Sequence, residues 1–238
     1  MAQFETVNYE KDGQLATITL NRPQTLNSFN IQMRDDIFEV LSAIKEDDEV
    51  HVVVIKGAGD RAFCAGADLS EFLTAPSPII ARQVRFERDV WGLFATIKQP
   101  IIAALHGYVL GSGIEIALFC DIRIASEDAQ FGLPETALGL IPAAGGSQTV
   151  PRTIGNTRAM ELLLTNRWIS ADEAFQAGLV NQVVPAEDLA KTVENLAKKI
   201  VNFEPLAVQS AKQAVKRGMD LSLIEGLELE NRLAINLI

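Results

Sequence analysis

The chain has 238 residues, of which 48% are hydrophobic and 6% aromatic, and its formal net charge at pH 7 is −10. This length and composition exclude a disordered or fibrous protein and favour one large α/β domain with a substantial core. The charge disfavours nucleic-acid and anionic-membrane partners, because a negative surface repels them. A small anionic ligand is still compatible, since a few local amides and cations suffice to bind it.

The cysteines and histidines further narrow the classes of protein that the sequence allows. Two cysteines, Cys64 and Cys120, are too few for a disulfide framework, which favours a reduced, cytoplasmic setting. His51 and His106 lack the spacing of metal ligands, so no metal site is expected. The first residues do not form a signal peptide, and every apolar stretch is broken well short of the roughly 18 residues of a transmembrane helix.

The first half of the chain alternates between predicted strands and helices. A polar turn at 11–13, which ends in glycine, predicts a hairpin, and Asn30 is a candidate helix N-cap. The β-branched run HVVVIK predicts a buried parallel strand. The expected strands are 4–9, 14–20, 51–56, 101–105 and 121–126, and the expected helices are 30–48, 78–98 and 114–119.

The second half changes character near residue 186. Residues 130–155 are rich in Gly, Pro and Ala and predict loops with a short helix, whereas the chain from Ala186 predicts only helices. Strand–strand–helix units followed by helices predict an α/β fold in which helices cover sheets. We therefore expect a core over 1–185 and a C-terminal helical region over 186–238. The expected late helices are 186–202, 206–217 and 221–237.

Two loops of small residues each follow a predicted strand and precede a predicted helix, at 65–68 (AGAD) and 110–113 (LGSG). The first amides of a helix have no intrahelical partner, and small residues let a ligand approach the backbone closely. Two such loops could together hold the developing oxyanion of a thioester. Taken alone, the loop at 110–113 is more simply explained as a tight strand-to-helix turn whose glycines serve geometry only.

Two glutamates are candidate acid/base groups. Glu115 stands in an apolar run, IEIALF, where an unpaired buried charge would be costly, so it either points to water or is an active-site carboxylate. Glu135 lies in a loop with few other charges and, taken by itself, is more simply explained as an exposed residue at a helix N-terminus. Two carboxylates facing one substrate could divide the work of donor and acceptor. Cys64 has no neighbouring histidine and Ser147 lacks a GxSxG elbow, so neither is expected to be a nucleophile.

Three long motifs resemble the crotonase superfamily, and more narrowly its enoyl-CoA hydratases. They are AFCAGADL at 62–69, QPIIAALHGYVLGSGIEIALFCDIRIAS at 99–126 and AQFGLPETALGLIPAAGGSQTVPRTIG at 129–155. The resemblance implies a crotonase-like spiral of ββα units followed by a C-terminal helical region that serves trimerisation. It also implies an acyl-CoA substrate and no cofactor, since coenzyme A is part of the substrate. Trimers, often paired as hexamers, are the assembly that it implies.

The resemblance also assigns roles to individual residues. The backbone N–H groups of Ala67 and Ser112 would form the oxyanion hole. Glu115 would orient and deprotonate a water, and Glu135 would supply the proton at the α-carbon of a 2-enoyl-CoA. The expected substrate and coenzyme A pocket is formed by Leu26, Ala65, Gly66, Asp68, Leu69, Tyr108, Gly111, Pro134 and Leu138.

The chain departs from the family pattern in two places. Ser112 stands where the family often has glycine, which should be tolerated if the backbone angles suit serine, because only the amide is needed. Relatives usually continue past the position of Ile238 with a segment that contributes to the coenzyme A site, so we expect the helical region to be incomplete at its end.

Other functions on the same scaffold are open. A Δ3,Δ2-enoyl-CoA isomerase would need only Glu135, and the presence of Glu115 favours hydration, because water needs its own base. A hydratase of a branched acyl-CoA would keep both acids. A non-catalytic RNA-binding member is a remote alternative, which the net charge of −10 disfavours.

Overall fold

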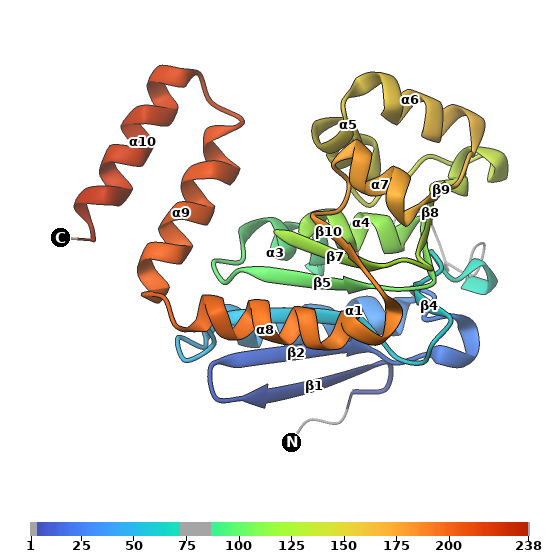
Figure 1. Cartoon of the computed structure of the whole chain (residues 1–238), viewed down its shortest axis with the longest axis horizontal. Helices are drawn as coiled ribbons and strands as arrows, with labels where there is room; N and C mark the ends of the chain where they lie inside the picture. Colours follow the sequence, from blue (N-terminus) through green and yellow to red (C-terminus); the bar gives the residue numbers. More distant parts are fainter. Residues whose placement is uncertain (1–3, 72–86, 238) are drawn as a thin grey trace.

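The computed structural model describes residues 4–71 and 87–237. These residues form a six-stranded sheet in the order β1-β2-β3-β5-β7-β10 and a four-stranded sheet in the order β4-β6-β8-β9 (Figure 1). In the larger sheet β1 is antiparallel to β2, and the other neighbours are parallel. The strands are β1 (Val7–Asp12), β2 (Leu15–Leu20), β3 (Val52–Gly57), β4 (Ala62–Cys64), β5 (Ile101–Leu105), β6 (Tyr108–Leu110), β7 (Ile122–Ser126), β8 (Gln130–Gly132), β9 (Ile169–Ser170) and β10 (Gln182–Val184).

Helices cover both faces of the larger sheet. Along β3, Val53 and Ile55 join the core that contains helix α1, whereas Val52 and Val54 join a second core that contains α8. A strand buried on both faces needs apolar residues at every position, which explains the run VVVI. The helices are α1 (Ile31–Glu46), α3 (Val90–Thr96), α4 (Ser112–Phe119), α5 (Gly146–Ile154), α6 (Asn156–Thr165), α7 (Ala171–Ala177), α8 (Leu189–Val201), α9 (Pro205–Gly218) and α10 (Leu223–Ile235), with short 3-10 turns η1 (Pro23–Thr25), η2 (Leu69–Glu71), η3 (Pro134–Leu138) and η4 (Ala186–Asp188).

Several expected elements agree with the structure. Asn30 is the N-cap of α1, and its side chain accepts a hydrogen bond from the Met33 amide. The hairpin lies slightly later than expected, because Asp12 pairs with Leu15 and leaves Gly13 and Gln14 as the turn. Gly13 has φ +56°, which suits a tight two-residue turn. In the expected helix 78–98, α3 accounts for the later part, and residues 72–86 lie outside the described residues.

The smaller sheet was not expected from the sequence. Its strands β4, β6 and β8 have three residues each and fall inside segments that predicted loops. They are mutually parallel, so their carboxyl ends meet at one edge of the sheet. Strands β9 and β10 and helices α6 and α7 were not anticipated either. In the described chain, no helix has the length and apolar character needed to cross a membrane.

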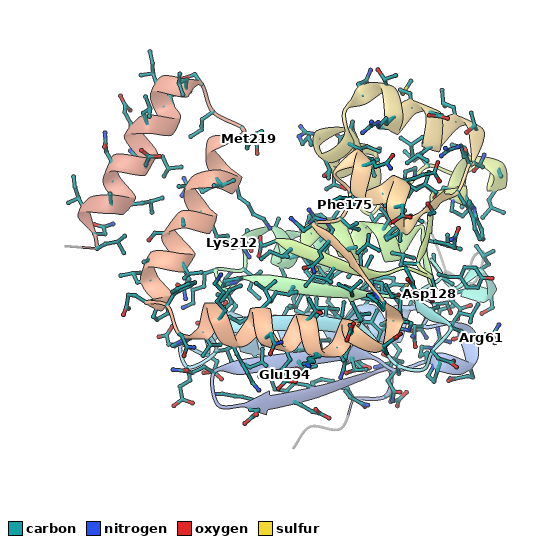
Figure 2. All side chains as sticks on the ribbon, in the orientation of Figure 1. Arg61, Asp128, Phe175, Glu194, Lys212 and Met219 are labelled. Atoms are coloured by element: carbon teal, nitrogen blue, oxygen red, sulfur yellow. The ribbon has the colours of Figure 1, made fainter. Side chains whose placement is uncertain are left out.

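The last two helices, α9 and α10, form a pair that extends away from the sheets (Figure 1). Two lysines on successive turns of α9 attach it to the body. Lys212 lies on the side of α9 that faces the sheets (Figure 2), 2.7 Å from Asp121 and 2.7 Å from the Gln99 carbonyl oxygen. Lys216 lies 3.1 Å from both Asp121 and the Phe119 carbonyl oxygen. Burial lowers the pKa of Lys212, so its ammonium depends on these partners.

Replacing Lys212 by methionine should lower the free energy of unfolding by about 1–2 kcal/mol. The reason is that the largely buried carboxylate of Asp121 loses one of its two lysine partners. Urea denaturation of the wild type and the variant at pH 7 measures the difference. The control Lys191→Met changes an exposed lysine of α8 and should cost less than about 0.5 kcal/mol. Equal stability of Lys212→Met and the wild type would contradict this attachment.

Candidate active site

The candidate site lies where the three parallel strands of the smaller sheet end. The loop 65–68 follows β4, Gly111 follows β6, and Glu135 comes three residues after the end of β8. The Gly111 amide donates to the Gly132 carbonyl at 2.9 Å, which joins the second and third of these segments. A β-carbon at Gly66 would lie 3.4 Å from the Leu110 carbonyl oxygen. The two glycine loops and the GLPE segment are therefore in direct contact.

Two backbone amides in these loops are candidate oxyanion donors. No residue in the described part of the chain accepts a hydrogen bond from the N–H of Ala67 or of Ser112. The Phe29 amide donates to the Gly66 carbonyl at 2.8 Å, and the Asp68 amide donates to the Phe29 carbonyl at 2.9 Å, so both sides of Ala67 are fixed. Rigid, unpaired amides of this kind can hold a developing oxyanion.

The serine at position 112 fits its backbone. Ser112 begins α4 and is not among the residues with positive φ, whereas Gly111 before it has φ +48° and ψ −116°. The conformation that only glycine adopts easily therefore falls on Gly111, and position 112 tolerates a side chain. This departure from the family pattern leaves the amide in place.

Glu115 is buried on the first turn of α4, with only 2% of its surface exposed. Its Oε1 accepts hydrogen bonds from the amides of Ala144 and Gly146, both at 2.9 Å. A β-carbon at Gly146 would lie 3.0 Å from the same oxygen, so glycine is needed for this approach. No role of this loop was expected from the sequence, although the consecutive glycines Gly145 and Gly146 were a signal for it.

Glu135 lies in the first turn of η3 and is half-buried. A β-carbon at Gly111 would lie 2.7 Å from its Oε1, which places the carboxylate over the second loop. Its Oε2 has no hydrogen-bond donor among residues 4–71 and 87–237. Burial, with a further contribution from the charge of Glu115, raises the pKa of Glu135 from 4.5 to about 7. A carboxyl with this pKa can exchange a proton near neutral pH.

The raised pKa predicts a pH-dependent stability. The proton on Glu135 stabilises the folded state below about pH 4.5, and this contribution is lost as pH rises through about 7. Glu135→Gln should therefore melt at a higher temperature than the wild type at pH 8 and at a similar one at pH 4.5. At pH 8 the melting temperature should rise by about 2–4 °C for each kcal/mol that the substitution adds to the free energy of unfolding. Thermal unfolding at both pH values measures it.

The expected pocket residues divide into two groups. In the first, the Leu26 carbonyl accepts from the Ala65 amide at 3.0 Å, and Leu26 has φ +55°. Asp68 pairs with Arg22 at 2.9 Å and accepts from the Ser70 hydroxyl at 2.6 Å, so it braces the loop. Leu69 is 55% exposed. These residues lie in or beside the loop 65–68.

The second group lies on the smaller sheet and after it. Tyr108 begins β6, and its ring packs edge-on against Trp168, with 5.8 Å between the ring centroids. Pro134 is half-buried beside Glu135, and Leu138 is 51% exposed at the end of η3. Pro134 therefore lies next to Glu135 in the chain, whereas Tyr108 and Leu138 are partly exposed.

The cysteines are buried and free. Burial raises the pKa of each thiol to about 12, for Cys64 and Cys120 alike, which disfavours the thiolate that a nucleophile requires. Within the described residues, no group of three or more His, Cys, Asp or Glu side chains is arranged to hold a metal ion.

Comparison with known proteins identifies the family to which this site belongs. Residues 10–238 match the family model described as enoyl-CoA hydratase/isomerase. The chain belongs to this family. It is 40% identical over 230 residues to the short-chain-enoyl-CoA hydratase of Clostridium acetobutylicum, covering 96% of this chain and 88% of the relative. It is 38% identical over 228 residues to the crotonyl-CoA hydratase of Syntrophomonas wolfei, covering 95% and 87%.

The fold comparison agrees. The enoyl-CoA hydratase subunit I of Geobacillus kaustophilus has a TM-score of 0.92 at 38% identity, covering 99% of this chain and 91% of that one. The predictions of a crotonase-like α/β fold and of membership in the enoyl-CoA hydratase family are thus confirmed. Enoyl-CoA hydration is also the activity for which these relatives are named, in agreement with the activity predicted from the sequence.

Proposed function

We propose that this protein is an enoyl-CoA hydratase, which adds water across the 2,3 double bond of a 2-enoyl-CoA to give a 3-hydroxyacyl-CoA. The observation that carries the proposal is the buried Glu115, which two backbone amides hold close to the titrating Glu135. A single carboxylate could move a proton between carbons, but addition of water needs a base for the water as well. The names of the relatives support the same reaction.

The thioester oxygen would bind between the N–H groups of Ala67 and Ser112. As the water oxygen bonds to C3, electron density moves toward the thioester oxygen, and two preorganised donors stabilise that charge. Glu115 would orient the water and take its proton. Glu135 would deliver a proton to C2, which its pKa of about 7 permits. The two carboxylates interact, so their titrations belong to the pair.

We propose the remaining pocket contacts on the same basis. Leu26 and the backbone from Ala65 through Gly66 and Asp68 to Leu69 would line the coenzyme A side, supported by the bond between the Ala65 amide and the Leu26 carbonyl. Gly111 and Pro134 would border the reacting carbons. Tyr108 and Leu138, which are partly exposed, have weaker support.

We also propose a cytoplasmic homotrimer or homohexamer. The free, buried cysteines support a reducing setting. Assembly is supported by large apolar side chains of α9 and α10 and the turn between them, which are more than half exposed in the single chain: Val215, Met219, Leu223, Ile224 and Ile235. Light scattering on the purified protein would distinguish three copies from six, and a monomer would contradict the proposal.

The activity can be tested directly. Purified protein is mixed with 2-enoyl-CoA and 3-enoyl-CoA thioesters, straight and branched, and the conjugated enoyl chromophore is followed. The proposal expects the chromophore to decay with 2-enoyl substrates and 3-hydroxyacyl-CoA to accumulate. If only 3-enoyl substrates react, and the chromophore appears instead of decaying, the protein is an isomerase. If no thioester reacts, the proposal fails.

A further inference from the structure

The residues on both sides of Glu135 are in contact with one side chain from the end of helix α6. Asn166 follows the last residue of α6, and its terminal amide lies 3.2 Å from the Leu133 carbonyl oxygen and 3.3 Å from the Pro134 carbonyl oxygen. Carbonyl oxygens only accept hydrogen bonds, so the nitrogen of the amide faces them and donates. The same nitrogen lies 3.2 Å from the hydroxyl oxygen of Thr136. Asn166 therefore contacts the chain immediately before and immediately after Glu135.

A second hydrogen bond joins the same two segments. The Thr136 hydroxyl donates to the Leu163 carbonyl oxygen at 2.6 Å. Leu163 lies in the last turn of α6, where carbonyl oxygens have no partner within the helix, so Thr136 satisfies one of them. The ring of Trp168 adds a third contact, because a β-carbon at Gly132 would lie 2.6 Å from it. The end of α6 and the residues after it therefore hold the turn that carries the proposed proton donor.

The backbone at Asn166 separates two possible roles of this residue. Asn166 has φ +54° and ψ +27°, the left-handed conformation that commonly ends a helix. Glycine adopts this conformation most easily, and asparagine tolerates it better than most residues that have a side chain. Glycine would therefore suffice to end α6. Asparagine in addition brings an amide to the turn of Glu135.

We propose that Asn166 is a positioning residue, which holds the carboxyl group of Glu135 where it can deliver a proton to C2 of the substrate. The proposal rests on the proposed hydratase function. In the described part of the chain no donor reaches Oε2 of Glu135, so this oxygen does not fix the side chain. Its place is set by the backbone of the turn, which the Asn166 side-chain amide and the Thr136 hydroxyl attach to α6. A displaced acid transfers its proton less well, even when the substrate still binds.

The test compares Asn166→Gly with the wild type in crotonyl-CoA hydration and in thermal unfolding. Glycine keeps the left-handed helix end and removes the amide, so the melting temperature should change by less than about 4 °C. Both kcat and kcat/KM should fall about ten- to a hundredfold, whereas KM should change less than about threefold, because the loops proposed to bind the thioester are unchanged. A residue that only ends the helix could be replaced by glycine without loss of activity.

The isosteric variant Asn166→Asp isolates the hydrogen-bond donor. Its carboxylate has the shape of the amide but can only accept, and it would face two carbonyl oxygens, so kcat should fall at least as far as in Asn166→Gly. The matched control is Asn156→Asp, which makes the same substitution at the exposed first residue of α6, at the opposite end of the helix. This control should keep kcat within about twofold of the wild type.

Thr136→Val removes the hydrogen bond to Leu163 and provides an independent variant. Its kcat should fall in the same direction, and it decides the question by the same criterion if Asn166→Gly does not fold. An active wild type whose kcat is unchanged in Asn166→Gly, or a variant in which only KM rises, overturns the role of Asn166 and leaves the hydratase function intact. A wild type that hydrates no 2-enoyl-CoA overturns the hydratase function itself.

Discussion

Gly111→Ala should lower kcat/KM for enoyl-CoA hydration by about 10²–10³, the scale of losing one oxyanion-hole donor. Gly111 has φ +48° and ψ −116°, a conformation that L-residues with a side chain rarely adopt. An added β-carbon would lie 2.7 Å from Oε1 of Glu135 and 3.5 Å from the α-carbon of Gly66. The backbone must shift to relieve this contact, and it carries the Ser112 amide with it. One methyl group thus disturbs the oxyanion hole and one carboxylate together.

The matched control is Gly13→Ala in the β1–β2 turn. Gly13 has φ +56°, and nothing lies within 4 Å of an added β-carbon there. Both variants carry the same kind of backbone strain, about 1–2 kcal/mol, but only Gly111→Ala has the contact at the site. Steady-state kinetics with crotonyl-CoA and thermal unfolding separate the two effects. Full activity in Gly111→Ala would exclude the Ser112 amide from the oxyanion hole.

The strands of the larger sheet other than β10 could be predicted, because their signals are local. The run VVVI of β3 and the run IIAAL of β5 are buried throughout, and such continuous apolar runs are typical of strands covered on both faces. Helix α1 was predictable for a similar reason, since Asn30 caps it and its apolar residues recur at helical spacing. Each of these elements can be identified from fewer than twenty consecutive residues.

The sheet that positions the site could not be predicted in this way. Strands β4, β6 and β8 have only three residues each, and glycines stand beside or inside them, so no periodic pattern can develop. Their pairing joins segments more than twenty residues apart. The useful signals near these strands were two short glycine loops and two isolated glutamates. Those were sufficient to suggest a site but not to show that its parts meet.

The surroundings of Glu115 show the same limit. Its local sequence left an exposed acid and a buried catalytic acid equally possible, because the deciding partners lie far along the chain. The amides of Ala144 and Gly146 are 29 and 31 residues away. Once these hydrogen bonds are present, a buried carboxylate no longer lacks compensation. The aromatic contacts of Trp91 with Phe29 and Phe119 could not be predicted either, since these residues come together only in the fold.

Glu115→Gln should lower kcat/KM for hydration at least about a hundredfold, the scale of general acid/base catalysis. The glutamine oxygen can still accept the hydrogen bonds of Ala144 and Gly146, so the fold should be preserved. The side chain of glutamine cannot take a proton from water, so the expected loss of activity comes from the missing base and not from a change of fold. Glu135→Gln should lower kcat/KM at least about as much, because it removes the proposed proton donor to C2. Steady-state kinetics on crotonyl-CoA measure both, with the exposed Glu127→Gln as the control.

The double variant decides whether the two glutamates act as one unit. If they handle the two parts of a single water, removing either one already disables the addition, and the second substitution adds little. Glu115→Gln/Glu135→Gln should then be within about tenfold of the slower single variant, instead of showing the product of both losses. Hydration that survives in Glu115→Gln would contradict the paired mechanism. Fully multiplicative losses would mean that each carboxylate contributes to a separate step and that the two do not act as one unit.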